Sequence, residues 1–404
     1  MKVLVIGGGA SGMMAALTAA EAPHHTVTLL ERQSRVGRKL LATGNGRCNL
    51  TNLHASPAHY HGGDPEFVTA ALERFSVGDT LEFFRSIGLI TVAEASGRVY
   101  PFSDQANSVV DVLRFALEQR GVELRCGCEV LSIGKKARGY TVKTAEERFY
   151  CDKLIVACGG AAGGKLGGTD LGYKLLKSMG HTVTALHPSL VQLKTDTAAT
   201  RSLKGVRADA GLTLKRNGAA AAVNAGEVQF TDFGISGPAV FELSREAAFG
   251  GDQVLLLDLL RPFTEEALTE YLAGKREAMP QILLEDFLTG ILHNRLGRVV
   301  LKQAGLDLGR RAGTLTGKEL GSIAHWIKYF PLTVTGVMGL EQAQVTAGGV
   351  LTSEFRPDTL ESRLCPGLFA TGEVLDFDGD CGGYNLQWAW SSGRLAGKLG
   401  ALGD

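Results

Sequence analysis

The chain begins with an unbroken apolar run that gives way abruptly to glycine. Lys2 to Ile6 shows no alternation of apolar and polar positions, which is typical of a parallel strand buried on both faces. A glycine-rich turn follows, and Met13 to Ala22 carries the small and apolar residues of a helix packed on that strand. A second apolar run, Thr26 to Leu30, ends in Glu31. The pattern predicts a strand, a turn, a helix and a second strand.

Residues 67–158 continue this mixture of helix and strand patterns. Their spacing predicts helices and antiparallel hairpins, the helices at 67–75, 77–87 and 103–120 and the hairpins at 89–100 and 122–150. A buried strand follows at 153–158 and ends in two glycines. We therefore expect an α/β domain with a small β-meander near 122–150.

The pattern of hydrophobic and polar residues changes twice more along the chain. Short strands with turn signals predict a barrel or sandwich over 189–262, and 263–330 reads as largely helical, with Leu283, Leu284, Phe287, Leu288, Ile291 and Leu292 on one face. From 345 the Rossmann-like pattern returns and ends in a helix from Asn385 to Leu399. The prediction is an α/β fold in which segments 1–188 and 345–404 form a Rossmann-like domain, with a β-barrel-like plus helical domain inserted at 189–344.

The glycine turn carries the first candidate chemistry. Gly7, Gly9 and Gly12 form a G-x-G-x-x-G turn, in which the three glycines allow a tight turn, close approach of a pyrophosphate and contact of helix with strand. The helix N-terminus offers N–H groups to phosphates. Glu31 lies nineteen residues past Gly12, where an acid can accept hydrogen bonds from a ribose. These features together predict a dinucleotide site.

Composition excludes several other classes. In 404 residues, 42 basic and 42 acidic side chains cancel, so no global field marks a nucleic-acid binder. No apolar run is long enough for a membrane span, and Met1 leads directly into a strand without room for a signal peptide, so we expect a cytoplasmic protein. Seven irregularly spaced cysteines do not form a disulfide framework or a zinc site. We interpret His54, His59 and His61 as part of a solvated loop without an acidic partner.

Three further stretches can converge on the same ligand. They are the loop 37–46, the turn 157–160 and the block 371–386. A bare NAD enzyme does not need the last of these, whereas an extended FAD does. Gly382 and Gly383 let backbone approach a planar ring, and the helix starting near Asn385 would stabilise negative charge on the reduced flavin.

On these motifs the chain resembles the BaiN/RdsA-type (YhiN-like) FAD-dependent oxidoreductases of the two-dinucleotide-binding-domain superfamily. The stretches that carry the resemblance are 40–52, Phe233 to Pro238, Val345 to Val350 and Thr371 to Gln387. The resemblance implies reduction of a C=C bond conjugated to a carbonyl, either uridine in ribosomal RNA giving dihydrouridine or an unsaturated steroid-like small molecule. It also implies that hydride passes from flavin N5.

Together with the glycine turn, the resemblance implies a set of FAD-binding residues from both ends of the chain. They are Gly7, Gly9, Ala10, Ser11, Gly12, Glu31, Arg32, Lys39, Thr43, Gly44, Asn45, Arg47, Val130, Gly159, Gly372, Glu373, Gly383, Asn385 and Leu386. At Lys39 the chain departs from the superfamily, which has serine there. No metal ligand is predicted.

Cys48 and Cys381 are the candidate catalytic residues. Cys48 has no cysteine within seventy residues, which argues against a redox disulfide and leaves two interpretations, a general acid near the flavin or a packed side chain. The basic loop Arg32 to Arg47 would lower its pKa. The same two interpretations apply to Cys381, and we interpret the remaining five cysteines as packed.

Other functions stay open at this point. A basic stretch holds six basic residues against Asp196 and Asp209, which fits either a solvated strand or an RNA-binding flavoprotein with a non-catalytic flavin; the six are Lys194, Arg201, Lys204, Arg207, Lys215 and Arg216. A small-amine oxidase is a third possibility. No second G-x-G-x-x-G unit exists, so NAD(P)H would dock only transiently as electron donor. We expect a small-molecule or ribosomal RNA substrate, no membrane and no obligate protein partner.

Overall fold

A computed structural model describes residues 1–401, apart from the side chains of Glu66 and Ala199. The chain forms two compact units, one from Met1–His187 and Leu340 onward, the other from Pro188–Gly339. The sequence pattern predicted boundaries after residues 188 and 344, which lie one and five residues from the observed boundaries. The α/β fold class with an inserted barrel is confirmed.

The first unit is built on a five-stranded parallel sheet. The strands, in spatial order, are β20 (Leu368–Ala370), β11 (Lys153–Val156), β1 (Lys2–Ile6), β2 (Thr26–Glu31) and β7 (Glu123–Cys126). The apolar run of β1 pairs with β11 on one side and β2 on the other, so Val3 to Ile6 are buried as their lack of alternation predicted. β20 comes from the C-terminal segment, which confirms that both chain ends build this sheet.

Smaller sheets complete the first unit. The predicted meander is the sheet of β8 (Val130–Lys135), β9 (Tyr140–Thr144) and β10 (Arg148–Cys151). The others are β3 (Thr51–Asn52) with β6 (Arg98–Pro101) and β5 (Thr91–Ala93), and β4 (Tyr60–Gly62) with β21 (Phe377–Gly379). The short strands β12 (His187–Ser189) and β19 (Val345–Ala347) lie near the unit's boundaries in sequence.

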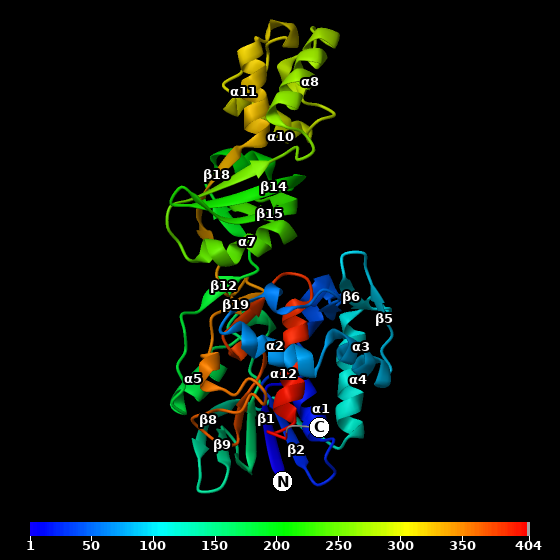
Figure 1. Ribbon diagram of the computed structural model, residues 1–404, viewed down its shortest axis with the longest axis vertical. Helices are drawn as coiled ribbons and strands as arrows, with labels where there is room; N and C mark the ends of the chain where they lie inside the picture. The colour runs from blue at the N-terminus through cyan, green and yellow to red at the C-terminus, as the bar shows by residue number, and fades with distance from the viewer. Residues whose placement is uncertain (402–404) are drawn as a thin grey trace. The chain divides into compact units, whose positions relative to one another are not determined.

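The described residues of the first unit also form α-helices. They are α1 (Ala10–Ala19), α2 (Pro65–Arg74), α3 (Val77–Ser86), α4 (Ala106–Gln119), α5 (Leu171–Ser178) and α12 (Tyr384–Gly397). Helix α1 packs on the parallel sheet, and α2 and α3 pack on α12. Helices α1 and α12 lie side by side (Figure 1) although they come from opposite ends of the chain. Small residues make this possible, because a Cβ at Gly393 would lie 2.5 Å from the carbonyl oxygen of Ser11, and one at Gly397 would lie 2.6 Å from that of Ala15.

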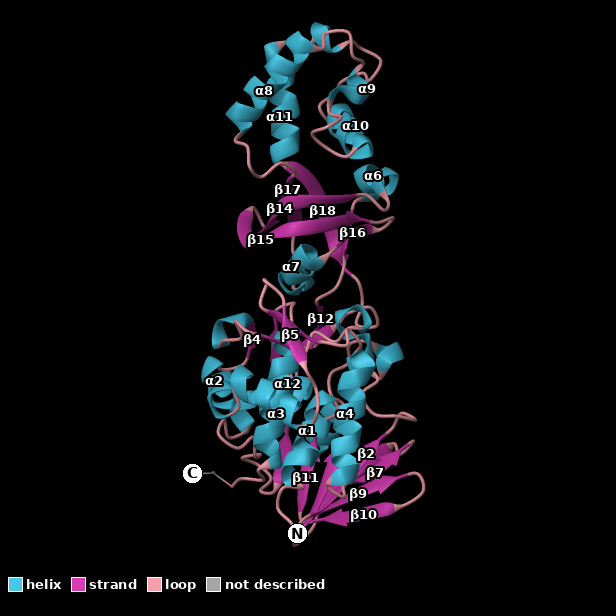
Figure 2. Ribbon diagram, turned by 90° about the vertical axis from the view of Figure 1, so that its right-hand side faces the viewer, coloured by secondary structure: helices cyan, strands magenta, loops and turns pink. Residues whose placement is uncertain are grey.

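The second unit is a closed six-stranded barrel with helices. The strands, in order around the barrel, are β13 (Leu193–Thr195), β16 (Gly234–Ser236), β15 (Ala219–Phe230), β14 (Arg207–Arg216), β17 (Gln253–Asp258) and β18 (Phe330–Val337). Its helices are α6 (Thr197–Thr200), α7 (Pro238–Ala248), α8 (Glu265–Ala278), α9 (Leu284–Phe287), α10 (Asn294–Gln303) and α11 (Gly317–Lys328). Within this unit α7 covers one end of the barrel, and α8 and α11 lie beyond the other (Figure 2).

The apolar face predicted across Leu283 to Leu292 is only partly helical. Helix α9 has only four residues and begins at Leu284, where the N–H groups of Leu284 and Glu285 donate to the carbonyl oxygens of Arg310 and Leu308 and not to a preceding helical turn. Gly290 then reverses the chain with φ +86°. Leu284, Phe287 and Leu288 are nevertheless buried, whereas Leu283 is 38% exposed, so only part of the predicted apolar face belongs to the core.

Candidate functional site

The glycine turn after β1 leaves an open helix end. A Cβ at Gly7, where φ is +109°, would lie 2.3 Å from the carbonyl oxygen of Ala157, and one at Gly12 would lie 1.8 Å from that of Gly7. Gly9 differs, because a Cβ there would meet nothing within 4 Å. Gly9 is the N-cap of α1, which has no side-chain cap, and the first helical bond runs from the Met13 N–H to Gly9. The N–H groups of Ala10 and Ser11 therefore border open space at a positive helix end.

Glu31 is fixed at the end of β2 by the same turn. Its Oε2 accepts from the Gly8 N–H at 2.7 Å, and its Oε1 accepts from the Gln33 N–H at 2.7 Å. Arg32 next to it donates to the carbonyl oxygens of Gly167 and Gly168 at 3.0 and 3.2 Å, so its side chain holds a neighbouring turn. A carboxylate oxygen can accept a second hydrogen bond, so Glu31 is both oriented and still able to bind a hydroxyl.

Lys39 and Glu373 join the predicted loop to the C-terminal segment. The Lys39 ammonium lies 2.7 Å from Oε2 of Glu373, and Oε1 of Glu373 accepts from the Thr346 N–H at 2.9 Å. A Cβ at Gly160 would lie 2.3 Å from the same carboxylate. Three of the sequence stretches that we expected to converge therefore meet at one carboxylate, and Glu373 neutralises the charge that Lys39 adds.

The loop after Lys39 is a kinked 3₁₀ segment, η1 (Leu40–Gly46). Its kink lies at Thr43, Gly44 and Asn45, and both Gly44 and Asn45 have positive φ, +57° and +56°. The Thr43 hydroxyl donates to the carbonyl oxygen of Leu40 at 2.7 Å and so stabilises the bend. Backbone held in this region by local bonds is common next to ligands.

The side chain of Arg47 interacts with residues outside the predicted cofactor site. Its guanidinium forms ion pairs with Asp104 and Glu94 and lies 3.9 Å above the centre of the Tyr100 ring. The side chain therefore has its charge satisfied within the 94–104 region. These interactions do not support the predicted contact between Arg47 and a cofactor.

Cys48 lies in the core beside this loop. Its side chain is 0% exposed, and burial raises the pKa of the thiol to about 12. The expectation that the basic loop lowers this pKa is therefore wrong, because desolvation by burial outweighs the hydrogen bond with Thr43, which alone would lower the pKa. A side chain sealed from solvent cannot touch a ligand without rearrangement, which favours the packing interpretation.

The other cysteines divide by exposure. Cys381 is half-buried and stands between Asp380 and Gly382, directly before α12. Cys151 and Cys365 are buried as expected, whereas Cys126 is exposed, so the packing interpretation is wrong for Cys126. Among the described residues no group of three or more His, Cys, Asp or Glu side chains could hold a metal ion.

Helix α12 begins like α1, at an uncapped glycine. Gly383 has φ +104°, and a Cβ there would lie 2.5 Å from the backbone of Thr51. The side chain of Asn385 accepts from the Gly379 N–H at 2.8 Å and donates to the Gly379 carbonyl at 2.7 Å, so it fixes the turn before the helix. Leu386 is half-buried in the first turn of α12. A positive helix end with no side-chain cap is again available to a ligand.

The remaining predicted residues occupy supporting positions. Gly372 has φ +75°, and a Cβ there would lie 2.5 Å from the Ser11 hydroxyl, so it lets the C-terminal segment approach α1. Gly159 has φ +70° with nothing within 4 Å of an added Cβ. Val130 is buried in β8, where it pairs with Thr144.

The sequence analysis missed a cluster at the paired strands β4 and β21, formed by His61 on β4, His59 directly before β4 and Asp380 directly after β21. Nδ1 of His59 lies 2.9 Å from Oδ2 of Asp380, and Nε2 of His61 lies 2.7 Å from Oδ1 of the same residue. The interpretation of these histidines as a solvated loop without an acid is wrong, because strand pairing brings Asp380 to them. The spacing His59-x-His61 was the only local signal, although only His61 belongs to β4 and His59 ends the short 3₁₀ turn Pro57–His59 before it.

These features fit an FAD. Two helices begin at glycine N-caps without side-chain caps, one of them beside open space, and an oriented carboxylate ends the second strand. By contrast, α3, α8 and α11 are capped by Ser76, Thr264 and Thr316. The pyrophosphate would lie at Gly9 and the ribose at Glu31, and the ring's anionic edge would lie at the start of α12.

A family model described as the HI0933-like protein Rossmann domain matches residues 1–399. The chain belongs to the HI0933-like family. It is therefore an oxidoreductase of the FAD-binding Rossmann type, and the sequence-based assignment is confirmed.

Two relatives match this chain along nearly their whole length. A 3-dehydro-bile acid delta(4,6)-reductase of Clostridium scindens is 40% identical over 405 residues, covering 99% of each chain. A ribosomal RNA dihydrouridine synthase of Escherichia coli is 32% identical over 392 residues, covering 96% of this chain and 95% of the relative.

Solved structures share the fold at much lower identity. A 3-ketosteroid delta1-dehydrogenase from Sterolibacterium denitrificans is 13% identical with a TM-score of 0.50 and covers 98% of each chain. A flavocytochrome c3 fumarate reductase is 18% identical with a TM-score of 0.50, covering 98% of this chain and 77% of the other. No described helix of the HI0933-like protein is long and apolar enough to cross a membrane.

Proposed function

We propose that this HI0933-like protein is an FAD-dependent reductase of a C=C bond conjugated to a carbonyl, acting on a steroid-like small molecule. The observation that carries the proposal is the 40% identity to the bile acid reductase over 99% of both chains. FAD, when bound, supplies the hydride. The polypeptide supplies position and charge stabilisation, and the residues described above suit those tasks.

Each end of the cofactor would have its own set of residues. Gly9 and the start of α1 would hold the pyrophosphate, and Glu31 would accept from the ribose. The start of α12, fixed by Asn385, would stabilise negative charge on the ring. Lys39 would be held by Glu373 rather than by phosphate.

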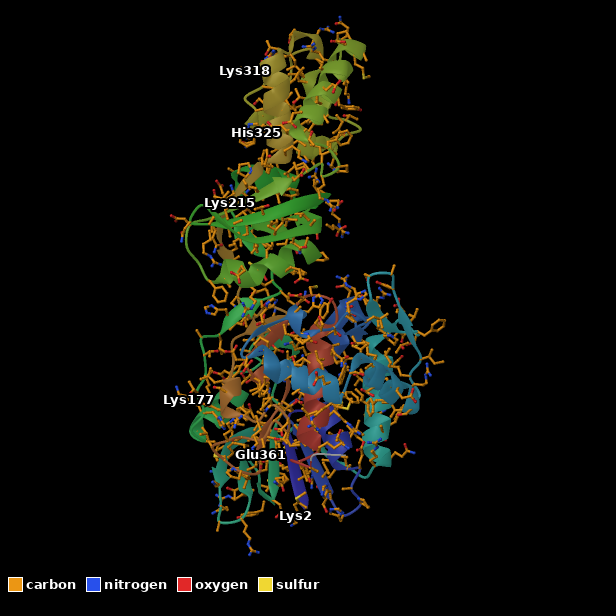
Figure 3. The ribbon with its side chains drawn as sticks, in the orientation of Figure 1. Lys2, Lys177, Lys215, Lys318, His325 and Glu361 are labelled. Carbon is orange, nitrogen blue, oxygen red and sulfur yellow. The ribbon has the colours of Figure 1, made fainter. Side chains whose placement is uncertain are left out.

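A specific observation favours a small molecule over RNA. RNA binding depends on cations that can pair with phosphates and release counterions. Three basic residues of the stretch 194–216 already have carboxylate partners; the pairs are Lys204 with Asp232 at 2.8 Å, Arg207 with Glu227 at 3.4 Å and Arg216 with Glu246 at 3.1 Å. Lys215, labelled in Figure 3, belongs to β14 in the same stretch. Half of the basic residues are thus neutralised locally, which weakens the RNA-binding alternative.

Uridine in ribosomal RNA remains the second candidate substrate, because the dihydrouridine synthase relative is 32% identical along the whole chain. Both substrates present a C=C bond conjugated to a carbonyl. NAD(P)H is the proposed electron donor, docking transiently at the flavin.

The proposal is tested by product analysis. The purified protein is incubated anaerobically with NADH or NADPH and either a 3-oxo-4,6-diene steroid or an unmodified ribosomal RNA transcript, and products are measured by mass spectrometry. We expect a gain of two hydrogens in the steroid. Dihydrouridine in the transcript without steroid reduction would favour the second candidate. If neither product forms, and a separate aerobic assay shows rapid reduction of the flavin by an amine followed by rapid reoxidation by oxygen, an amine oxidase would be favoured.

A further inference from the structure

Asp380 holds two imidazole rings, one on each carboxylate oxygen. Its Oδ2 faces Nδ1 of His59 and its Oδ1 faces Nε2 of His61, at 2.9 and 2.7 Å. The backbone fixes the same arrangement, because β4 pairs with β21 and the Asp380 N–H donates to the His59 carbonyl at 3.0 Å. Side chains and backbone therefore define one geometry.

His59 is the better placed of the two rings for chemistry. It stacks on the Tyr384 ring with centres 4.3 Å apart and planes 21° apart, and its side chain is 33% exposed. Nδ1 is bound to Asp380, and among the described residues no hydrogen bond reaches Nε2. An imidazole oriented by a carboxylate through one nitrogen, with the other nitrogen accessible, is an arrangement that serves proton transfer.

The cluster lies beside the helix end assigned to the flavin ring. Tyr384, under the His59 ring, is the first residue of α12, and the Tyr60 hydroxyl donates to its carbonyl oxygen at 2.9 Å. Asn385 also donates to the Asp380 carbonyl at 3.3 Å. These contacts join the His59 ring to the start of α12.

The surroundings favour the ionised form of Asp380. Burial opposes the ionisation of Asp380, but hydrogen bonds from His61 and His59 outweigh it and hold its pKa below the ordinary value. The other titratable or charged groups that line this corner are Tyr60, Tyr384, Asp378, Cys381 and Arg98. An ionised carboxylate can hold a protonated imidazole through a charge-assisted hydrogen bond.

We propose that His59 donates the proton that completes reduction of the double bond, with Asp380 and His61 as positioning residues. This inference rests on the proposed function. The β-carbon of the acceptor gains a hydride from reduced FAD, the C=C π bond breaks, and the carbonyl oxygen takes the negative charge as an enolate. The α-carbon then takes the proton from Nε2 of His59 as the carbonyl re-forms. Solvent reprotonates His59, and NAD(P)H supplies the two electrons.

The main test compares His59→Gln with His54→Gln, an exposed histidine five residues away on the same segment. Each protein is reduced photochemically without oxygen and mixed with a 3-oxo-4,6-diene steroid or with ferricyanide, which needs no proton at carbon. For His59→Gln we expect reoxidation by the steroid to slow roughly 100-fold, the lower end of general acid catalysis. Reoxidation by ferricyanide, FAD affinity and every property of His54→Gln should match the wild type.

A second variant tests the geometry without turnover. Asp380→Asn should change the chemical shift of the His59 C2 proton in the NMR spectrum and leave that of His54 unchanged. It should also slow reoxidation by the steroid about tenfold, since a positioning partner typically contributes 10- to 100-fold. If His59→Gln loses FAD, this variant decides the question.

The outcomes separate the two claims. Steroid reoxidation of His59→Gln or of Asp380→Asn at the wild-type rate would overturn the role of His59 and leave the reductase intact. Wild-type protein that is reoxidised by ferricyanide but not by the steroid would overturn the proposed function, and with it this inference.

Discussion

The first unit contains two histidine–carboxylate clusters. In each, Nδ1 of a histidine faces a carboxylate oxygen, but one histidine is partly exposed and the other is fully buried. His59 lies on Asp380 with 33% of its side chain exposed. His181 lies on Glu354, with Nδ1 2.8 Å from Oε2, and its side chain is 0% exposed. Its Nε2 lies 3.0 Å from the Ser362 hydroxyl, so serine, histidine and carboxylate form a connected row. The row resembles a nucleophilic triad in its contacts, but access to solvent separates a reactive site from a structural one.

The buried cluster is saturated by its neighbours. The Ser362 hydroxyl oxygen accepts from the N–H groups of Leu364 and Cys365 at 3.1 and 2.9 Å. Glu354 also accepts from the Thr182 N–H at 2.9 Å, and the His181 ring stacks on Phe355. These bonds tie together three segments of the chain and occupy both ring nitrogens of His181 and the hydroxyl of Ser362. The comparison teaches that the residue types do not identify the site, whereas exposure and an available ring nitrogen do.

The largest expected effect that separates the clusters is on stability. His181→Ala removes a buried ring and leaves the Glu354 carboxylate and the Ser362 hydroxyl without their partner. Loss of such a partner costs about 3 kcal/mol, or roughly 100-fold in the unfolding equilibrium. Denaturant unfolding should show this loss, whereas steroid reoxidation should keep its rate.

The matched variant is His59→Gln, at a partly exposed position where the midpoint of unfolding should change little. Equal midpoints for the two variants would contradict the division into a structural and a reactive cluster.

A third carboxylate, Glu31, extends the comparison to the cofactor. Glu31→Ala should weaken FAD about tenfold, because hydrogen bonds to charged groups contribute on the order of 1.5–3 kcal/mol. Affinity for FMN, which lacks the adenosine ribose, should change less. Glu354→Ala is the control, since its carboxylate serves only the fold. Equal losses for FAD and FMN in fluorescence titrations would exclude Glu31 from the adenosine end.

The buried cluster also predicts loss of stability in acid. Burial lowers the pKa of His181, and although burial alone would raise that of Glu354, hydrogen bonds from Thr182 and His181 lower it. For both groups the unfolded chain binds protons more readily, so their contribution is present above the unfolded pKa values and is lost as pH falls through the folded ones. The melting temperature should decline from about pH 7 downward. In His181→Gln the decline between pH 7 and 5 should be smaller; an identical profile would exclude His181 as its source.

The smallest effect is expected at Cys48. Cys48→Ser places a hydroxyl in a fully buried site, which costs about 1 kcal/mol if its hydrogen bond is imperfect. Steroid reoxidation should keep its rate because the thiol does not reach solvent. Slowed reoxidation without a change in stability would restore Cys48 as a candidate acid.

The contrast between local and distant pairs also explains what the sequence could predict. The glycine turn and Glu31 were predictable because each requirement is local: an apolar strand, glycines at fixed spacing and an acid at the next strand end. Asp380 was not, because its partners His59 and His61 lie more than 300 residues earlier and meet it only through two three-residue strands. The ion pairs of Arg47 and the short helix that begins at Leu284 likewise depend on contacts between distant residues. The spacing of apolar residues does not predict such contacts.

The most direct test of the account is a single-turnover measurement on the wild-type protein. Protein purified with its cofactor is reduced photochemically without oxygen and mixed with one equivalent of a 3-oxo-4,6-diene steroid, and the flavin and dienone absorbances are followed together. We predict that oxidised flavin returns as the dienone absorbance disappears, with one steroid consumed per flavin, and that the cofactor released on denaturation is FAD. Reduced flavin that persists beside unchanged dienone, or release of FMN, would contradict the account.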